Sequence, residues 1–139
     1  MLLGCIGVQG CSSSTPLIVK HPLDPTHEKL LKIGAAYTRF CTAQGKAPAG
    51  PADLQPMLAP KGGEDDVWRS SRDGQPFVVC WGVDLRKPLS WAKGVSVLAY
   101  ENQGAQGSRY VATTFHNVEL LSDKEFHEAS FPPGHTPGS

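Results

Sequence analysis

The sequence GVSVLAYENQGAQGSRYVATTF, residues 94–115, decides the fold class of this chain. Its two ends, residues 94–100 and 108–115, are rich in β-branched and aromatic residues and alternate well enough to form strands with one buried face. The polar, glycine-containing run between them, residues 101–107, is typical of a hairpin loop. Because hairpins join neighbouring strands, this stretch predicts an antiparallel sheet.

Further elements are predicted on both sides of this hairpin. Residues 76–83, PFVVCWGV, form a compact β-rich block, and the polar turn of residues 72–75, RDGQ, precedes it. After the hairpin, residues 117–121 lead into residues 122–125, SDKE, which match a capping box with Ser at the cap and Glu at the third helical position. A short helix to about Ala129 is therefore expected. The fold class is α+β, with a small antiparallel sheet of three to four strands.

An amphipathic helix is predicted ahead of the sheet. Apolar residues recur at three- and four-residue steps through residues 30–41, and Gly45 ends the pattern as a left-handed C-cap, about 18 residues after the start. The sequence leaves two starting points open. Either Asp24 is the cap with Pro25 at the first helical position, or Thr26 is the cap. A single apolar face implies that the helix covers one surface, the sheet.

The length and composition fit one domain. The chain has 139 residues, with 13 Lys and Arg against 13 Asp and Glu. This balance argues against nucleic acid as a partner, because phosphate affinity needs a surplus of positive charge. We expect a signal-like segment and tether in residues 1–26, a single α+β domain in residues 27–130, and a disordered tail rich in Pro and Gly in residues 131–139.

The first residues resemble the end of a bacterial lipoprotein signal peptide. In the lipobox pattern, an aliphatic residue stands three positions before the cysteine and a small residue stands one before it. Residues 8–11, VQGC, fit this pattern, and residues 2–5, LLGC, fit it too. We expect lipidation at Cys11, because the Ser-rich run after it is typical of a flexible tether. The resemblance implies a lipid-anchored, extracytoplasmic protein of the bacterial cell envelope.

The predicted order of elements resembles the globular half of type II secretion pseudopilins and other pilin-like proteins. Residues 30–48, LLKIGAAYTRFCTAQGKAP, are similar to the segment where a pseudopilin helix runs into its loop. Residues 72–77, RDGQPF, are similar to the segment that leads into the first strand. The resemblance covers roughly residues 27–120 and implies a pilin-like head without catalytic residues. A lipobox-like stretch stands in place of the family's long hydrophobic half-helix, so the resemblance does not imply filament assembly.

The cysteine and histidine residues match no catalytic or metal-binding motif. Cys41 and Cys80 form either one disulfide or two separately buried thiols, and the sequence leaves both readings open. The five histidines form no HExxH motif and no helical pair at i,i+4, so we expect no metal site, no cofactor and no catalytic residues. The alternative function is a small extracytoplasmic enzyme or metal-binding protein that uses Cys80 and His116.

Aromatic residues near the strands suggest an interaction surface. Trp91 falls in a loop, and together with Tyr100 and Tyr110 it could form an exposed platform for a ligand. The strand of residues 108–115 is a second candidate, as an edge that accepts a strand from a partner. We therefore expect a non-catalytic, lipid-anchored envelope protein that acts as an interaction or structural module for an unknown envelope protein. A soluble cytoplasmic domain is the remaining reading, since no Lys or Arg precedes Lys20.

Overall fold

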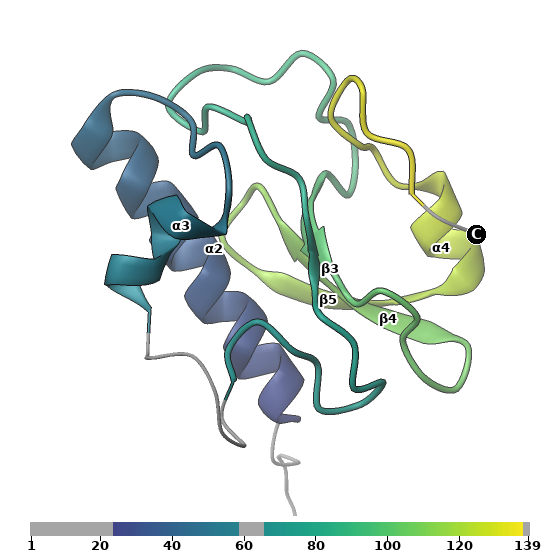
Figure 1. Ribbon diagram of the computed structural model, residues 1–139. Coiled ribbons are helices and arrows are strands. Elements are labelled where there is room, and N and C mark those ends of the chain that lie inside the picture. The colour runs from purple at the N-terminus through teal and green to yellow at the C-terminus, as the bar shows by residue number, and fades with distance from the viewer. Residues whose placement is uncertain (1–23, 59–65, 138–139) are drawn as a thin grey trace, which may run out of the picture.

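The computed structural model describes residues 24–58 and 66–137 (Figure 1). The predicted α+β class with an N-terminal helix and an antiparallel sheet is confirmed. The predicted lipidation site Cys11 lies outside the described residues. The elements are α2 (Pro25–Gln44), α3 (Pro51–Leu54), the 3-10 turn η2 (Gln55–Met57), β2 (Val78–Val79), β3 (Val97–Tyr100), β4 (Ser108–Thr113), β5 (Val118–Ser122) and α4 (Asp123–Glu128).

The sheet is a meander in the order β2-β3-β4-β5, and each neighbouring pair is antiparallel. The three predicted strands are present but shorter, and β2 contributes only two residues. The fourth strand, β5, pairs along β4, with Tyr110 opposite Leu120. The expectation that residues 108–115 form an edge strand is therefore wrong, because β3 and β5 occupy both sides of β4.

Helices cover both faces of the sheet. Arg109 and Tyr110 are neighbours on β4, so their side chains point to opposite faces. The Tyr110 ring contacts His27 of α2 at a centroid distance of 5.9 Å, whereas the Arg109 guanidinium lies 4.4 Å from the centre of the Phe126 ring in α4. Hence α2 and α4 lie on opposite sides of the sheet (Figure 1).

Local chemistry sets the ends of α2. Asp24 is the N-cap, its side chain accepts a hydrogen bond of 2.8 Å from the Thr26 N–H, and Pro25 is the first helical residue. Of the two predicted starting points, the Asp24 cap is confirmed. Gly45 ends the helix in the left-handed conformation, with φ 69°, and donates its N–H to the Cys41 carbonyl. The helix has 20 residues, slightly more than predicted.

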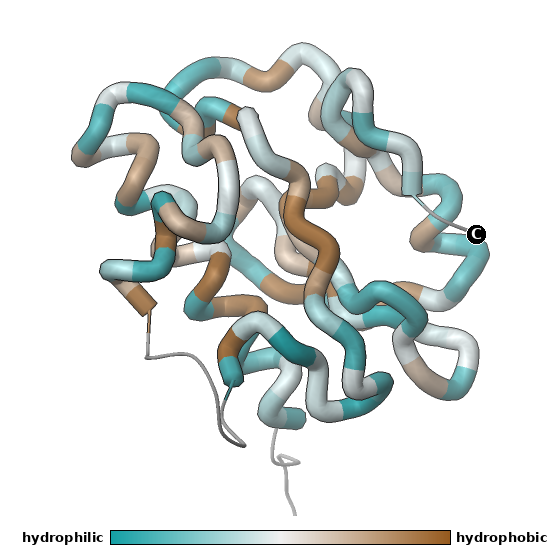
Figure 2. The backbone as a smooth tube through the Cα atoms, viewed as in Figure 1, coloured by the Kyte–Doolittle hydropathy of each residue, from teal (hydrophilic) through white to brown (hydrophobic). Residues whose placement is uncertain are grey.

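The core lies on both faces of the sheet, against α2 on one face and against Phe126 of α4 on the other, and hydrophobic segments gather in the middle of the molecule (Figure 2). The Tyr37 hydroxyl donates a hydrogen bond of 2.7 Å to the Cys80 carbonyl and accepts one of 2.9 Å from the Val83 N–H. Cys41 and Cys80 are both buried and free, so the reading with two separate thiols is confirmed. Burial raises the pKa of the Cys80 thiol to about 12, which keeps it protonated at neutral pH.

A buried carboxylate fixes the β3–β4 hairpin. Glu101 is fully buried and accepts hydrogen bonds from the Ser70 hydroxyl at 2.6 Å and from the Tyr110 N–H at 2.8 Å. The Nε atom of Arg72 lies 3.3 Å from the same carboxylate and supplies the compensating charge. These partners offset the desolvation of Glu101 and join the turn before β2 to the hairpin.

The same turn also holds the β3–β4 loop through Asp73. Its Oδ2 atom accepts hydrogen bonds of 2.9 Å from the N–H groups of Gln103 and Gly104. Gly104 has φ 73°, and a Cβ atom there would lie 2.1 Å from the Ser108 carbonyl oxygen. Only glycine fits this close approach of two backbone segments.

The C-terminal elements are more ordered than predicted. The capping box of α4 is confirmed, because the Ser122 side chain accepts from the Glu125 N–H and the Glu125 side chain accepts from the Ser122 N–H. The expectation of a disordered tail is wrong for residues 131–137. Phe131 packs against Phe126 at 5.3 Å, and the Tyr100 hydroxyl shares a hydrogen bond of 2.9 Å with His135 Nε2.

Candidate interaction site

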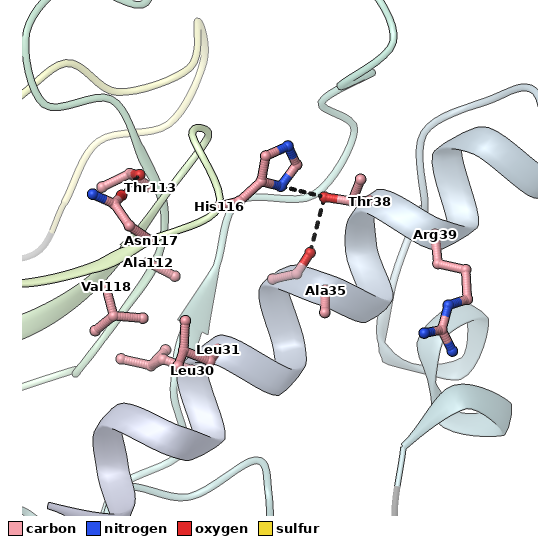
Figure 3. A pocket seen from close by; sticks show the side chains of 11 residues that line it. Leu30, Leu31, Ala35, Thr38, Arg39, Ala112, Thr113, His116, Asn117 and Val118 are labelled. Atoms are coloured by element: carbon pink, nitrogen blue, oxygen red, sulfur yellow. Dashed lines mark hydrogen bonds between the residues drawn. The ribbon is translucent and has the colours of Figure 1, made fainter. Parts of the chain in front are cut away.

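A groove of about 500 Å³ separates α2 from the β4–β5 hairpin (Figure 3). Its surface is mostly apolar, and the two walls come from segments that are far apart in the sequence. The helix contributes the flank between its buried face and solvent, and the hairpin contributes the end of β4, the turn and the start of β5. The groove is lined by Leu30, Leu31, Gly34, Ala35, Thr38 and Arg39 on α2 and by Ala112, Thr113, His116, Asn117 and Val118 on the hairpin.

Small residues on α2 create the space in this groove. A Cβ atom at Gly34 would have no heavy atom within 4 Å, so the helix surface is low at this position. Ala35 follows it and adds only a methyl group. A glycine inside a helix is destabilising relative to alanine by about 1 kcal/mol. Gly34 therefore lowers the stability of α2, and binding of a partner in the groove is what would offset this loss.

A hydrogen bond crosses one end of the groove. The Thr38 hydroxyl donates to the Gly34 carbonyl at 3.1 Å, and its oxygen lies 3.2 Å from His116 Nδ1 (Figure 3). Since the single hydroxyl proton is used by Gly34, the Thr38 oxygen accepts from the Nδ1–H of His116. In the neutral imidazole, Nε2 is then a hydrogen-bond acceptor. His116 has a positive φ of 67°, which the tight turn between β4 and β5 requires.

Two large apolar side chains are exposed in the described part of the chain, and both belong to this hairpin. Phe115 is 65% exposed and precedes His116 at the turn. Leu120 is 50% exposed and lies on the same face of β5 as Val118, which lines the groove. The groove is therefore followed along β5 by the exposed Leu120, and Phe115 is exposed at the turn next to His116, which lines the groove. We call the groove together with Phe115 and Leu120 the hairpin surface.

The free edge of the sheet runs along this surface. The Tyr110 carbonyl accepts from the Glu101 N–H at 3.1 Å, and its own N–H bonds the Glu101 side chain, so both backbone groups of Tyr110 point toward β3. Its cross-strand partner Leu120 is then a non-hydrogen-bonded position of the β4–β5 pair. The N–H and C=O of Leu120 point away from β4 into the open edge, and those of Val118 do the same by alternation.

The aromatic residues predicted as an interaction surface do not lie together. Tyr100 is 3% exposed and packs against Phe126 in the core, so it is not available to a ligand. Tyr110 is half-buried on the opposite face, under α2 and 4.8 Å from the Arg72 guanidinium. Trp91 is half-buried and lines a different groove, together with Trp81. Sequence reasoning missed Phe115 and Leu120. The one local signal was the apolar Phe115 in a polar turn, because the adjacent Leu120 and Leu121 do not show which of the two is exposed.

The alternative site of Cys80 and His116 is not assembled. The Cys80 N–H bonds the Leu98 carbonyl on the β2 side of β3, whereas His116 lies in the turn beyond β4 and contacts Thr38. In residues 24–58 and 66–137, no three His, Cys, Asp or Glu side chains converge in a geometry that could hold a metal ion. Within the same residues, no helix has both the length and the apolar character needed to pass through a membrane.

Comparisons with known proteins give no relative. No family model, no curated protein and no solved structure matches the chain.

Proposed function

We propose that this chain is a non-catalytic, lipid-anchored protein of the bacterial cell envelope, whose pilin-like α+β head binds another protein through the hairpin surface. The observation that carries the proposal is the exposure of Phe115 and Leu120 on the one hairpin that also forms the apolar groove and the free edge. Large apolar side chains exposed beside an apolar groove are typical of a contact site on an otherwise polar surface.

The energetics of this surface favour a protein ligand. Complete burial of a Leu or Phe side chain contributes about 1.5–3 kcal/mol each, so the two residues together supply a useful part of a binding free energy. The unpaired backbone groups of Val118 and Leu120 add hydrogen bonds if the partner presents an extended strand. A small ligand would use neither feature as fully as a protein segment does.

The lipid anchor is proposed from the lipobox pattern at Cys11. Thirteen residues, 12–24, separate Cys11 from the start of α2, and a segment of that length spans at most about 45 Å. This reach is enough to place the head and its hairpin surface beside another envelope protein. The pilin-like description rests on the order of elements, one long helix followed by an antiparallel meander.

Site-specific photo-crosslinking tests the binding surface. A photoreactive phenylalanine analogue replaces Phe115 in the full chain, and a matched variant carries it at Glu128, an exposed position in α4 on the opposite face of the sheet. Irradiation in the membrane fraction is expected to give a discrete adduct heavier than one chain at position 115 and none at position 128. Absence of an adduct at 115, or equal adducts at both positions, would contradict the proposal.

Intact mass spectrometry tests the anchor. The gene is expressed with its native upstream region, and the mature protein is recovered from the membrane fraction. A chain that begins at Cys11 and carries the mass of two or three acyl groups is expected. An unmodified chain that retains Met1 in the soluble fraction would remove the lipid anchor and the envelope location from the proposal.

A further inference from the structure

We infer that the partner of the β5 edge is a second copy of this chain, joined by antiparallel pairing of the two β5 strands about a two-fold axis at Leu120. This inference rests on the proposed function and names the occupant of the free edge, the part of the hairpin surface that contains Leu120. It follows from the directions of the backbone groups, from the order of side chains in β5 and from the position of α2.

The backbone of β5 is complementary to itself. Val118 and Leu120 direct their N–H and C=O groups into the open edge, because both backbone groups of Tyr110, the partner of Leu120, bond Glu101 on the other side of β4. When two β5 strands meet in antiparallel orientation with Leu120 at the centre, the two Leu120 residues exchange both of their hydrogen bonds. Val118 then faces Ser122 of the second copy. The Ser122 N–H is already held by Glu125, and the Ser122 carbonyl, at the N-cap of α4, accepts the first bond of that helix, so the two bonds of the Leu120 pair are the backbone bonds of this pairing.

The side chains select this register. With Leu120 at the centre, each Leu120 lies opposite Leu120 of the second copy, and the exposed half of both side chains is covered. Glu119 lies opposite Leu121 of the second copy. A pairing centred on Glu119 would instead oppose two carboxylates and shorten the overlap of the five-residue strands. The register centred on Leu120 therefore gives the longest pairing without facing like charges.

The symmetry also suits two chains on one membrane. A two-fold axis perpendicular to the sheet keeps both α2 helices on the same face of the joined sheet. The first turn of α2 lies near this axis, because His27 contacts Tyr110 and Tyr110 is the cross-strand partner of Leu120. Both chains therefore enter from the same side, as two lipid anchors in one leaflet require. The balance of 13 positive and 13 negative residues adds no long-range repulsion between copies.

Cysteine crosslinking of the full chain tests the register. In Leu120→Cys, the two introduced residues are a hydrogen-bonded pair with Cα atoms about 5.5 Å apart, within the range for a disulfide. In the matched control Glu119→Cys, the same two-fold axis places the Cα atoms about 8 Å apart, beyond that range. Cys41 and Cys80 are buried, and the unsubstituted chain gives the background from the remaining cysteines.

Mild oxidation in the membrane fraction is expected to convert most of Leu120→Cys to a species of twice the chain mass and to leave Glu119→Cys at background. Background crosslinking of Leu120→Cys, or equal crosslinking of both variants, would overturn the inference.

Sedimentation of the detergent-solubilised full chain is the second measurement. The unsubstituted protein is expected at the mass of two chains and Leu120→Lys at the mass of one, with unchanged circular dichroism. An unsubstituted protein at the mass of one chain would overturn the inference.

These outcomes separate the inference from the proposed function. A photo-adduct at position 115 whose mass is not twice that of the chain, together with background crosslinking of Leu120→Cys, would leave the hairpin surface as a binding site for a different protein. The second copy would then be wrong and the proposed function would stand. If position 115 gives no adduct and Leu120→Cys stays at background, both fail.

Discussion

The two edges of the sheet are built differently. At the β2 edge the strand has only two residues, and backbone hydrogen bonds hold the chain on both sides of it, from the Phe77 N–H to the Trp68 carbonyl at 2.8 Å and from the Gly82 N–H to the Pro48 carbonyl at 3.0 Å. At the β5 edge the strand has five residues, no described segment pairs with it, and Leu120 is half exposed.

This difference shows that protection of one sheet edge from pairing with another strand does not extend to the other edge of the same sheet. Short strands and covering segments prevent unwanted pairing, and the β2 edge has both devices. The β5 edge has neither, and its one central charge, Glu119, points to the other face from Leu120. The chain thus closes one edge and keeps the other available for pairing.

The largest effect is expected from Gly104→Ala, in the loop that joins the two halves of the sheet. The new Cβ atom would clash with the Ser108 carbonyl at 2.1 Å, and φ is 73°. We expect a loss of about 3 kcal/mol in the free energy of unfolding, measured by urea denaturation. Gly107→Ala is the matched control, because φ is 76° there but no atom lies within 4 Å. It should cost about 1 kcal/mol. Equal losses would show that backbone strain alone, without the clash, accounts for the effect.

A pair of substitutions compares the two edges directly. Trp81 stacks on Tyr37 at 5.9 Å beside the β2 edge, so Trp81→Ala is expected to lower the free energy of unfolding by about 2 kcal/mol. Leu120→Ala at the β5 edge is expected to change it by less than about 0.5 kcal/mol at a protein concentration low enough to exclude association. Urea denaturation of both variants checks this. Similar losses would mean that the β5 edge is a structural part of the head.

The turn beside the β2 edge should give a pH-dependent effect. Burial opposes ionisation of Asp73, but hydrogen bonds from the N–H groups of Gln75, Gln103 and Gly104 outweigh it and lower the pKa of its carboxyl. A lowered pKa in the folded state stabilises the protein above the unfolded value of about 4, and this contribution is lost as the pH falls through the folded pKa. Asp73→Asn is expected to cost about 1 kcal/mol at pH 7, after allowance for partial exposure.

Denaturation of the Asp73→Asn variant and the unsubstituted chain at a series of pH values checks this prediction. The difference between the two should shrink below pH 4 or so. A difference that stays constant down to pH 2 would mean that the Asp73 charge does not act through these hydrogen bonds.

The smallest effect concerns the groove itself. Gly34→Ala should raise the free energy of unfolding by about 0.5–1 kcal/mol, because the helix gains propensity and the added methyl group meets no atom within 4 Å. Gly34→Leu fills the groove at the same backbone position. Thermal unfolding measures stability, and photo-crosslinking from position 115 measures binding. Binding is expected to survive Gly34→Ala and to fall in Gly34→Leu, and equal adduct yields would show that the groove is not used.

Local signals in the sequence were sufficient for the helices. Asp24, Pro25 and Gly45 set the ends of α2, and Ser122 with Glu125 sets the start of α4, because capping depends on residues a few positions apart. The fourth strand was missed as a strand of its own. Its turn contains neither Gly nor Pro, and the position with positive φ is taken by a histidine, so the usual hairpin signal is absent.

The candidate site depended on contacts that no local pattern contains. The groove exists because residues near Gly34 and near His116 meet across the molecule. In the sequence, Tyr100 stands next to a polar loop, a position typical of a surface aromatic residue. In the structure, α4 and Phe131 cover it. The Pro-rich end was read as a tail because composition does not reveal that Phe131 has an apolar surface to dock on.

The buried carboxylate of Glu101 has a consequence for misfolding. A hairpin that slipped by one residue would move every side chain of the strand to the wrong face and would leave Glu101 desolvated without the Tyr110 N–H and the Ser70 hydroxyl. Apolar residues such as Val97 and Leu98 would tolerate many wrong pairings, since hydrophobic contacts are not directional. Glu101 therefore penalises incorrect registers more than it stabilises the correct one, and it widens the energy gap between the native head and its near-native competitors.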